Sequence, residues 1–216
     1  MNLETARLQM IGQQLRAWEV LDDRVLGVMA EVPREHFVAP GWQALAYADT
    51  AVPVGAGKRL APPKIQGRAL QSLAPRDNET VLEIGCGSGY LSACLARLAA
   101  RVTAIERQPE LVAATKRNLA ELGIDNVTVL EGDALALEFP QRFDVVCVNG
   151  SLPAARPELE RLLAVGGRLF VVVGRPPVMT AHRITRTGES EWLRESLFET
   201  CLPALEQAPS ATEFEF

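Results

Sequence analysis

The chain lacks the features that would place it in a membrane or outside the cell. In its 216 residues, no apolar run approaches the roughly 20 residues of a membrane-spanning helix, and the longest candidates, such as Leu169–Val173, have the length of a strand. The N-terminus mixes Glu4, Arg7 and Gln9 with apolar residues, unlike a secretory signal. We therefore expect a cytoplasmic protein with no membrane partner.

Cysteine and histidine are scarce as well. The four cysteines form no C-x-x-C pair, and the two histidines lie far apart in the sequence. A structural zinc site needs four nitrogen or sulfur ligands at a recognisable spacing, and that spacing is missing. We predict a protein without a metal centre, whose thiols stay free in a reducing cytoplasm.

Positive charge is not in excess. The formal net charge is −5, but Glu199–Phe216 contains four glutamates and no lysine or arginine, so the rest of the chain is close to neutral. This balance argues against a nucleic-acid partner that would require a basic face.

The lack of a coiled-coil heptad favours a monomer. Phe214 and Phe216 give the acidic tail two side chains able to dock on the body.

Apolar periodicity predicts helices in the first third of the chain. Residues 3–18 repeat apolar side chains at helical spacing, and Asp22 or Asp23 can cap a second helix that ends before Pro33. The segment Pro33–Pro63 is rich in proline and glycine, and we expect it to be a long functional loop. Ile65–Leu73 is helical in pattern again.

From Glu79 onward, short apolar strands alternate with helices. Two helices are expected, Leu91–Ala100 and Pro109–Leu122, the second ended by Gly123. Further along, two alternating segments around Gly188 predict a closing antiparallel hairpin. The expected sheet strands are Thr80–Ile84, Val102–Ile105, Val127–Leu130, Asp144–Val148 and Arg168–Val173.

Strands that alternate with helices imply a mostly parallel central sheet with helices on both faces. No internal repeat, low-complexity tract or linker divides the chain. The fold class we predict is α/β, a single Rossmann-like domain over residues 1–216. Residues 1–75 would form an N-terminal helical extension and a covering loop, and residues 76–216 the sheet core with its hairpin.

The strongest functional signal is a glycine-rich turn between the first expected strand and the helix that follows it. Such a turn lets the backbone approach a ligand closely, although a structural turn of the same kind is common. The turn consists of Gly85, Cys86, Gly87, Ser88, Gly89 and Tyr90.

Acidic residues accompany the ends of three successive strands. Glu83 lies two residues before the first glycine, and Glu106 ends the next strand, 21 residues after that glycine. Alone, Glu83 could be satisfied by local backbone amides and Glu106 could be a solvated strand end. Together they indicate one crevice, where Glu106 would accept hydrogen bonds from both ribose hydroxyls. The residues placed to bind an adenine edge are Gly132, Asp133 and Ala134.

The form of the turn discriminates between nucleoside cofactors. A dinucleotide oxidoreductase would need G-x-G-x-x-G and a second half-site, and the sequence offers neither. The G-x-G-x-G form with its acidic partners resembles the class I S-adenosylmethionine (SAM) methyltransferases. The Asn-Pro-Pro-aromatic motif of the amino-methylating branch is absent, and Asn149 follows the corresponding strand. We predict SAM as cofactor, with Arg107 and Asn149 among its contacts.

Three strings upstream of the glycine turn carry a more specific signal. They are Val32-Pro33-Arg34-Glu35, Ala46-Tyr47-Ala48-Asp49 and Pro53-Val54-Gly55-Ala56-Gly57. They resemble the protein-L-isoaspartate (D-aspartate) O-methyltransferase family, and the resemblance continues to about Arg186.

The resemblance implies transfer of a methyl group from SAM to the α-carboxylate of an isoaspartyl residue in a damaged protein. A carboxylate is already deprotonated at neutral pH, so it needs no general base. The enzyme must align the two reactants and remove water from the nucleophile. The expected partners are isoaspartyl-containing proteins or peptides.

One loop departs from the family pattern Gly-x-Gly-Gln-Thr-Ile-Ser-x-Pro. The Thr and Ser positions, credited with holding cofactor and substrate carboxylate, are Arg59 and Ala61 here. Losing one neutral hydrogen bond costs about 0.5–1.5 kcal/mol. Lys58, Arg59 or Lys64 either supplies a charge-assisted contact to a carboxylate or belongs to a solvated loop face. Asp49 either orients the loop or the amino group of SAM, or serves a turn; with Arg59 and Ala61 it completes the candidate catalytic positions.

Three interpretations follow from the sequence. The leading one is a repair-type protein carboxyl methyltransferase with a diverged substrate loop. The second keeps SAM chemistry but transfers the methyl group to another carboxylate. The third is a SAM-binding module without turnover, as the missing hydroxyl at Ala61 would permit.

Overall fold

A computed structural model describes residues 2–206 of the chain, so Phe214 and Phe216 lie outside the described residues. The helices are α1 (Leu3–Gln9), α2 (Asp23–Glu31), α3 (Pro63–Leu73), α4 (Tyr90–Ala96), α5 (Pro109–Glu121) and α6 (Pro157–Glu160). The strands are β1 (Val52–Gly55), β2 (Lys58–Leu60), β3 (Thr80–Ile84), β4 (Arg101–Glu106), β5 (Val127–Glu131), β6 (Phe143–Leu152), β7 (Leu163–Arg175), β8 (Val178–Gly188) and β9 (Glu191–Thr200).

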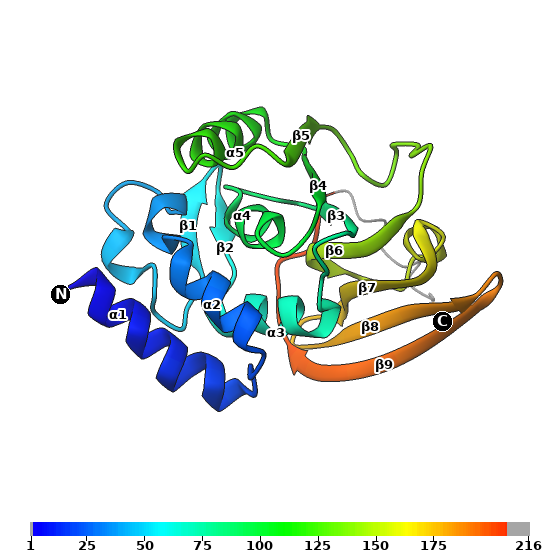
Figure 1. Ribbon diagram of the computed structural model, residues 1–216, viewed down its shortest axis with the longest axis horizontal. Helices are drawn as coiled ribbons and strands as arrows, with labels where there is room; N and C mark the ends of the chain where they lie inside the picture. Colours follow the sequence, from blue (N-terminus) through cyan, green and yellow to red (C-terminus); the bar gives the residue numbers. More distant parts are fainter. Residues whose placement is uncertain (1, 207–216) are drawn as a thin grey trace, which may run out of the picture.

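Seven strands form the central sheet, in the order β5-β4-β3-β6-β7-β8-β9. The pairs from β5 through to β7 are parallel, whereas β8 and β9 join antiparallel. The last two strands extend as an arm at the lower right of Figure 1. This arrangement confirms the predicted α/β class and the closing hairpin. It also places a topological switch point between β3 and β6, where open α/β sheets bind ligands.

Apolar side chains build a core on each face of the sheet. Val81 of β3 packs on the face covered by α1 to α5, and Leu82 and Ile84 pack on the opposite face. In the described part of the chain, this second face is covered by the short helix α6 and by an irregular segment that contributes Leu135 and Phe139. The helices are therefore distributed less evenly over the two faces than the alternating pattern suggested.

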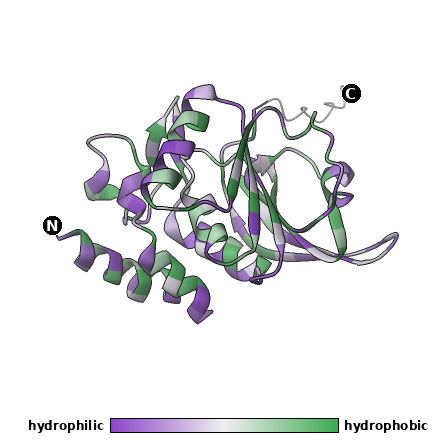
Figure 2. Cartoon of the chain, turned by 45° about the horizontal axis from the view of Figure 1, so that its top comes forward, coloured by the Kyte–Doolittle hydropathy of each residue, from purple (hydrophilic) through white to green (hydrophobic). Residues whose placement is uncertain are grey.

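The N-terminal extension continues α1 through a π-helical turn, Met10–Leu15, and a 3-10 turn, Arg16–Trp18. Hydrophilic and hydrophobic segments alternate along it in Figure 2, as expected for a helix that packs through one face. Met10 and Leu15 are fully buried. The helical prediction for residues 3–18 is confirmed.

The segment predicted as one long loop contains a small hairpin. β1 and β2 pair antiparallel across a turn in which Ala56 and Gly57 both have positive φ, +48° and +70°. A two-residue turn with two left-handed residues is the common hairpin turn, and glycine adopts it without strain. The alternation of Val52, Val54 and Leu60 around this turn was the available signal. Two further 3-10 turns, Arg34–Phe37 and Gln43–Leu45, precede it.

Several elements differ from the prediction in length; β7, for example, runs from Leu163 to Arg175 rather than from Arg168 to Val173, and two of the differences lie near the glycine turn. α4 ends at Ala96, four residues earlier than expected, because the N–H groups of Arg97 and Leu98 bond carbonyls only three residues back. β6 continues beyond Val148 to Leu152, because after a register shift Ser151 and Leu152 pair with β7. The first change shortens a helix under the glycine turn, and the second moves Asn149 onto a strand.

The cap of α2 provides a stability test. Asp22 accepts hydrogen bonds from the backbone N–H groups of Arg24 (2.8 Å) and Val25 (3.4 Å), whereas the side chain of Asp23 is 94% exposed. We expect Asp22→Ala to lower the free energy of unfolding by about 1 kcal/mol. Asp23→Ala is the matched control and should cost less. Urea denaturation of both variants measures the difference, and equal losses would contradict the assignment of Asp22 as the cap.

Candidate active site

The carboxyl ends of β3, β4 and β6 open onto a cavity of about 340 Å³. That volume lies within the roughly 300–1,000 Å³ of small-molecule sites. The predicted residues that line it are Arg59, Ala61, Gly85, Cys86, Gly87, Glu106, Arg107, Gly132, Asp133, Ala134 and Asn149. The topology therefore gathers at one place residues that are spread over some 90 positions of the sequence.

The glycine turn is held from behind by α5. Thr115 donates a hydrogen bond to the carbonyl oxygen of Gly87 (2.7 Å), and Asn118 donates one to that of Ser88 (3.0 Å). Gly89 has φ +93°, and a Cβ on it would lie 2.8 Å from the methyl group of Thr115. Gly89 does not line the cavity; its lack of a side chain lets helix α5 approach the turn.

Glu106 connects the end of β4 to the glycine turn. One carboxylate oxygen accepts from the N–H of Gly87 (2.9 Å), and the other accepts from the N–H groups of Arg107 (2.8 Å) and Gln108 (3.0 Å). The residue is buried yet lines the cavity. Three backbone donors fix the carboxylate in place, so it presents a pre-oriented acceptor to a ligand.

Glu83 lies behind the cavity rather than in its wall. Its side chain is fully buried and points toward α4, where Ser92 donates to it; Asn149 donates from the other side at 3.5 Å. Burial raises the pKa of Glu83 to about 7, and the nearby charge of Glu106 adds to the increase. Asn149 lines the cavity, so its hydrogen bond connects the buried Glu83 to the cavity wall.

Two other predicted positions lie outside the cavity wall. Asp49 forms an ion pair with Lys64 (2.7 Å), which fits the loop-orienting alternative of the prediction. Tyr90 is fully buried: its ring packs edge-on against Phe37 and lies 4.7 Å below the guanidinium of Arg34. Its side chain belongs to the packing under the turn.

The buried Arg34 ties the covering loop to the core. Its guanidinium donates to the backbone oxygens of Ala46 (2.7 Å) and Ala61 and to the side chain of Gln66. It therefore fixes the backbone of Ala61 at the cavity wall. The sequence placed Arg34 within a family string without assigning it this role.

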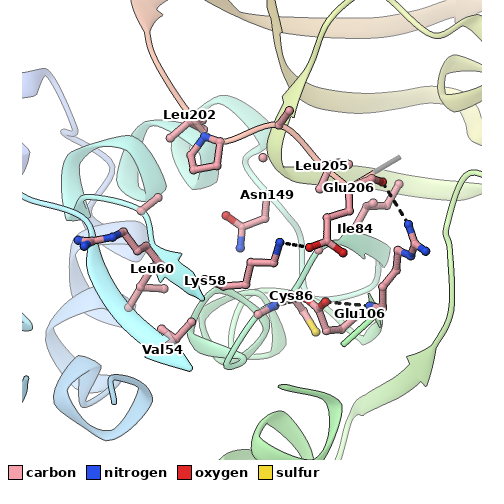
Figure 3. A pocket seen from close by; sticks show the side chains of 18 of the residues that line it. Val54, Lys58, Leu60, Ile84, Cys86, Glu106, Asn149, Leu202, Leu205 and Glu206 are labelled. Carbon is pink, nitrogen blue, oxygen red and sulfur yellow. Dashed lines mark hydrogen bonds and ion pairs between the residues drawn. The ribbon is translucent and has the colours of Figure 1, made fainter. Parts of the chain in front are cut away.

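The loop cations differ in their partners. Lys64 pairs with Asp49, and Lys58 pairs with Glu206 across the cavity (Figure 3). Arg59 donates to the backbone oxygen of Ala51 (3.0 Å). Among the described residues, no carboxylate lies within ion-pairing distance of the Arg59 guanidinium. It is the loop cation with charge left to offer a ligand.

Sequence reasoning missed one wall of the cavity. The segment Cys201–Glu206 crosses over the glycine turn, and all six of its residues line the cavity. Figure 3 shows Leu202, Leu205 and Glu206 facing Cys86 and Asn149. The segment has no motif, and its apolar residues become informative only when the fold places them beside β6.

The geometry can be compared with known proteins. The family model described as protein-L-isoaspartate(D-aspartate) O-methyltransferase matches residues 6–202. The chain belongs to this family.

Related proteins cover most of the chain. It is 38% identical over 199 residues to the protein-L-isoaspartate O-methyltransferase 2 of Pelobacter propionicus, covering 91% of this chain and 88% of the relative. A Methylorubrum populi protein-L-isoaspartate O-methyltransferase is 41% identical, covering 86% and 87%. A Plasmodium falciparum structure described as a beta-aspartate methyltransferase (PCMT), in complex with S-adenosyl-L-homocysteine, superposes with a TM-score of 0.80 at 21% identity, covering 95% of this chain and 99% of that one. This last comparison supports the fold.

Because the chain belongs to the protein-L-isoaspartate O-methyltransferase family, the predicted departure of its loop from the family pattern matters for the site. Arg59 and Ala61, which the resemblance predicts at the family's Thr and Ser positions, both line the cavity. The predicted departure from the family pattern therefore concerns residues of the cavity wall itself.

No helix among residues 2–206 is long and apolar enough to cross a membrane. Within the same residues, no group of three or more histidine, cysteine or acidic side chains is arranged to hold a metal ion.

The titration of Glu83 can be measured through stability. An unfolded glutamate titrates near pH 4.3, so between about pH 4.5 and 7 the folded chain keeps a proton that the unfolded chain has lost. The free energy of unfolding should fall as pH rises through this window, by up to about 3 kcal/mol in total.

The Glu83→Gln variant should lose this slope, because its side chain stays neutral at every pH. Glu131→Gln, at the exposed end of β5, is the matched control and should keep it. Urea denaturation between pH 5 and pH 8 gives the slopes. Equal slopes for wild type and Glu83→Gln would show that Glu83 is ionised throughout.

Proposed function

We propose that the protein transfers the methyl group of SAM to the α-carboxylate of isoaspartyl residues in proteins or peptides. The observation that carries the proposal is the glycine turn tied to Glu106 at the wall of the cavity, in a chain of the protein-L-isoaspartate O-methyltransferase family. The products are the isoaspartyl methyl ester and S-adenosylhomocysteine.

The polar residues of the cavity wall suit the hydrogen-bonding groups of SAM. The carboxylate of Glu106 would accept hydrogen bonds from the ribose hydroxyls, and Asp133 with the neighbouring backbone would bind the adenine edge. Asn149, backed by Glu83, lies at the far side of the glycine turn. In this proposal Asn149 would contact the amino-acid portion of SAM.

The reaction needs no proton transfer from a side chain. The acceptor carboxylate is ionised at neutral pH, and the sulfonium provides a neutral leaving group, so one displacement forms the ester without a base. The protein contributes alignment and removal of water. The hairpin β1–β2 would cover the reacting groups, with Arg34 holding Ala61 and Arg59 available for the acceptor carboxylate.

The proposal includes three expectations that rest on the sequence. We expect the enzyme to act as a monomer, in the cytoplasm, and without nucleic acid. Transfer to another carboxylate, or cofactor binding without turnover, is an outcome of the experiments below.

The first experiment uses a matched pair of peptides, one isoaspartyl and one aspartyl. We expect base-labile methyl label from SAM to enter the isoaspartyl peptide alone, since the family membership indicates that acceptor. SAM binding is confirmed in the same sample. Binding without transfer to either peptide would overturn the proposed acceptor, and label in the aspartyl peptide would overturn the specificity.

The second experiment restores the family hydroxyl with Ala61→Ser. One regained neutral hydrogen bond is worth about 0.5–1.5 kcal/mol, so kcat/KM for the isoaspartyl peptide should rise about two- to tenfold. Ala51→Ser, which adds a hydroxyl elsewhere on the cavity wall, is the control and should change little. If Ala61→Ser leaves kcat/KM unchanged, the substrate carboxylate does not bind at this position.

A further inference from the structure

The segment Cys201–Glu206, here called the strap, is anchored on a single residue of β6. The buried Ser151 donates from its hydroxyl to the carbonyl oxygen of Leu202 and from its N–H to that of Pro203, both at 2.9 Å. The carbonyl oxygen of Ser151 accepts from the N–H of Leu205, also at 2.9 Å. The strap therefore pairs with β6 much as a short parallel strand would.

Leu205 packs directly on backbone that carries no side chain. Its methyl group lies 3.0 Å from where a Cβ on Gly85 would be and 2.9 Å from the corresponding position on Gly150. A Cβ on Gly150 would come closer to this methyl group than real Cβ contacts do, and one on Gly85 would be at the tight limit, so a side chain at either position would force Leu205 to shift. Gly85 thus accommodates the strap, in addition to any cofactor.

Glu206 connects the two sides of the cavity. Its carboxylate pairs with the ammonium group of Lys58 on β2 and accepts from the side chain of Gln108 (2.8 Å), which precedes α5. Arg107 donates to its backbone oxygen at 3.4 Å. Figure 3 shows the Lys58–Glu206 pair lying across the cavity, with Cys86 and Glu106 on one side and Asn149 on the other.

We infer that the strap closes the SAM site and that Glu206 is its latch, whose contacts must break before the nucleoside enters or leaves. Lys58 comes from the hairpin over the cavity, and Gln108 comes from the side that holds the ribose-binding Glu106. One carboxylate therefore bridges the cover and the floor of the site. The identity of the ligand rests on the proposed function.

The solvent exposure of the Lys58–Glu206 ion pair determines how strongly the latch should slow ligand release. The side chains of Lys58 and Glu206 are 36% and 41% exposed, so their ion pair is a weak one that thermal motion can open. Loss of this pair and of one hydrogen bond should speed ligand release by roughly two- to tenfold. A latch of this strength retains the cofactor without preventing turnover.

The test measures the dissociation rate of labelled S-adenosylhomocysteine from the full chain, by dilution into excess unlabelled ligand. Glu206→Gln should release the ligand roughly two- to tenfold faster than wild type. Glu199→Gln, an exposed residue on β9 outside the cavity, removes the same charge and should match wild type. Lys58→Glu should also speed release, and the double variant Lys58→Glu with Glu206→Lys should restore most of the retention.

Salt supplies a second readout. Raising the ionic strength from about 0.01 M to about 1 M shortens the Debye length from about 30 Å to about 3 Å, so wild-type release should accelerate while Glu206→Gln changes little. Equal release rates for wild type and Glu206→Gln, or equal salt dependence, would overturn the latch. A wild-type chain that does not bind S-adenosylhomocysteine would instead overturn the proposed cofactor.

Discussion

The carboxylate of Glu106 is the constraint on which the rest of the site depends. It gathers three backbone N–H groups, one from the glycine turn and two from the start of the α5 segment. A buried carboxylate is stable only when hydrogen bonds compensate its lost hydration. One donor lies in the connection between β3 and α4, and the other two lie in the connection between β4 and α5. The residue that would bind the ribose therefore also fixes the conformation of the glycine turn.

The cavity combines three parts that differ in how firmly they are held. The floor belongs to the sheet and is fixed by the packing of both cores. The cover is the β1–β2 hairpin, whose attachment runs through the buried guanidinium of Arg34. The strap is held by backbone hydrogen bonds to Ser151 but ends in an exposed ion pair. A reaction that depends on alignment and exclusion of water needs all three parts in place.

Prediction from sequence succeeded where local pattern and tertiary environment agree. The bounds of β3 match the expected Thr80–Ile84, because a short apolar run before a glycine turn has few other conformations available. The capped helix α2 and the Gly123 stop of α5 depend on neighbouring residues in the same way. The continuation of β6 to Leu152 was missed because it depends on pairing with β7, which is remote in sequence.

The sequence by itself determined the α/β fold and the glycine turn with its acidic partner Glu106, because both follow from local patterns of residue types, and its resemblance to the family identified the altered loop at Arg59 and Ala61. Only the tertiary structure decided that Glu83 lies behind the cavity, that Asp49 pairs with Lys64, and that the strap forms a wall. The first two outcomes depend on which side chains the fold brings together, and the third depends on the hydrogen bonds between Ser151 and the backbone of the strap. The spacing of residues in the sequence does not reveal these contacts, because they form only when the sheet packs.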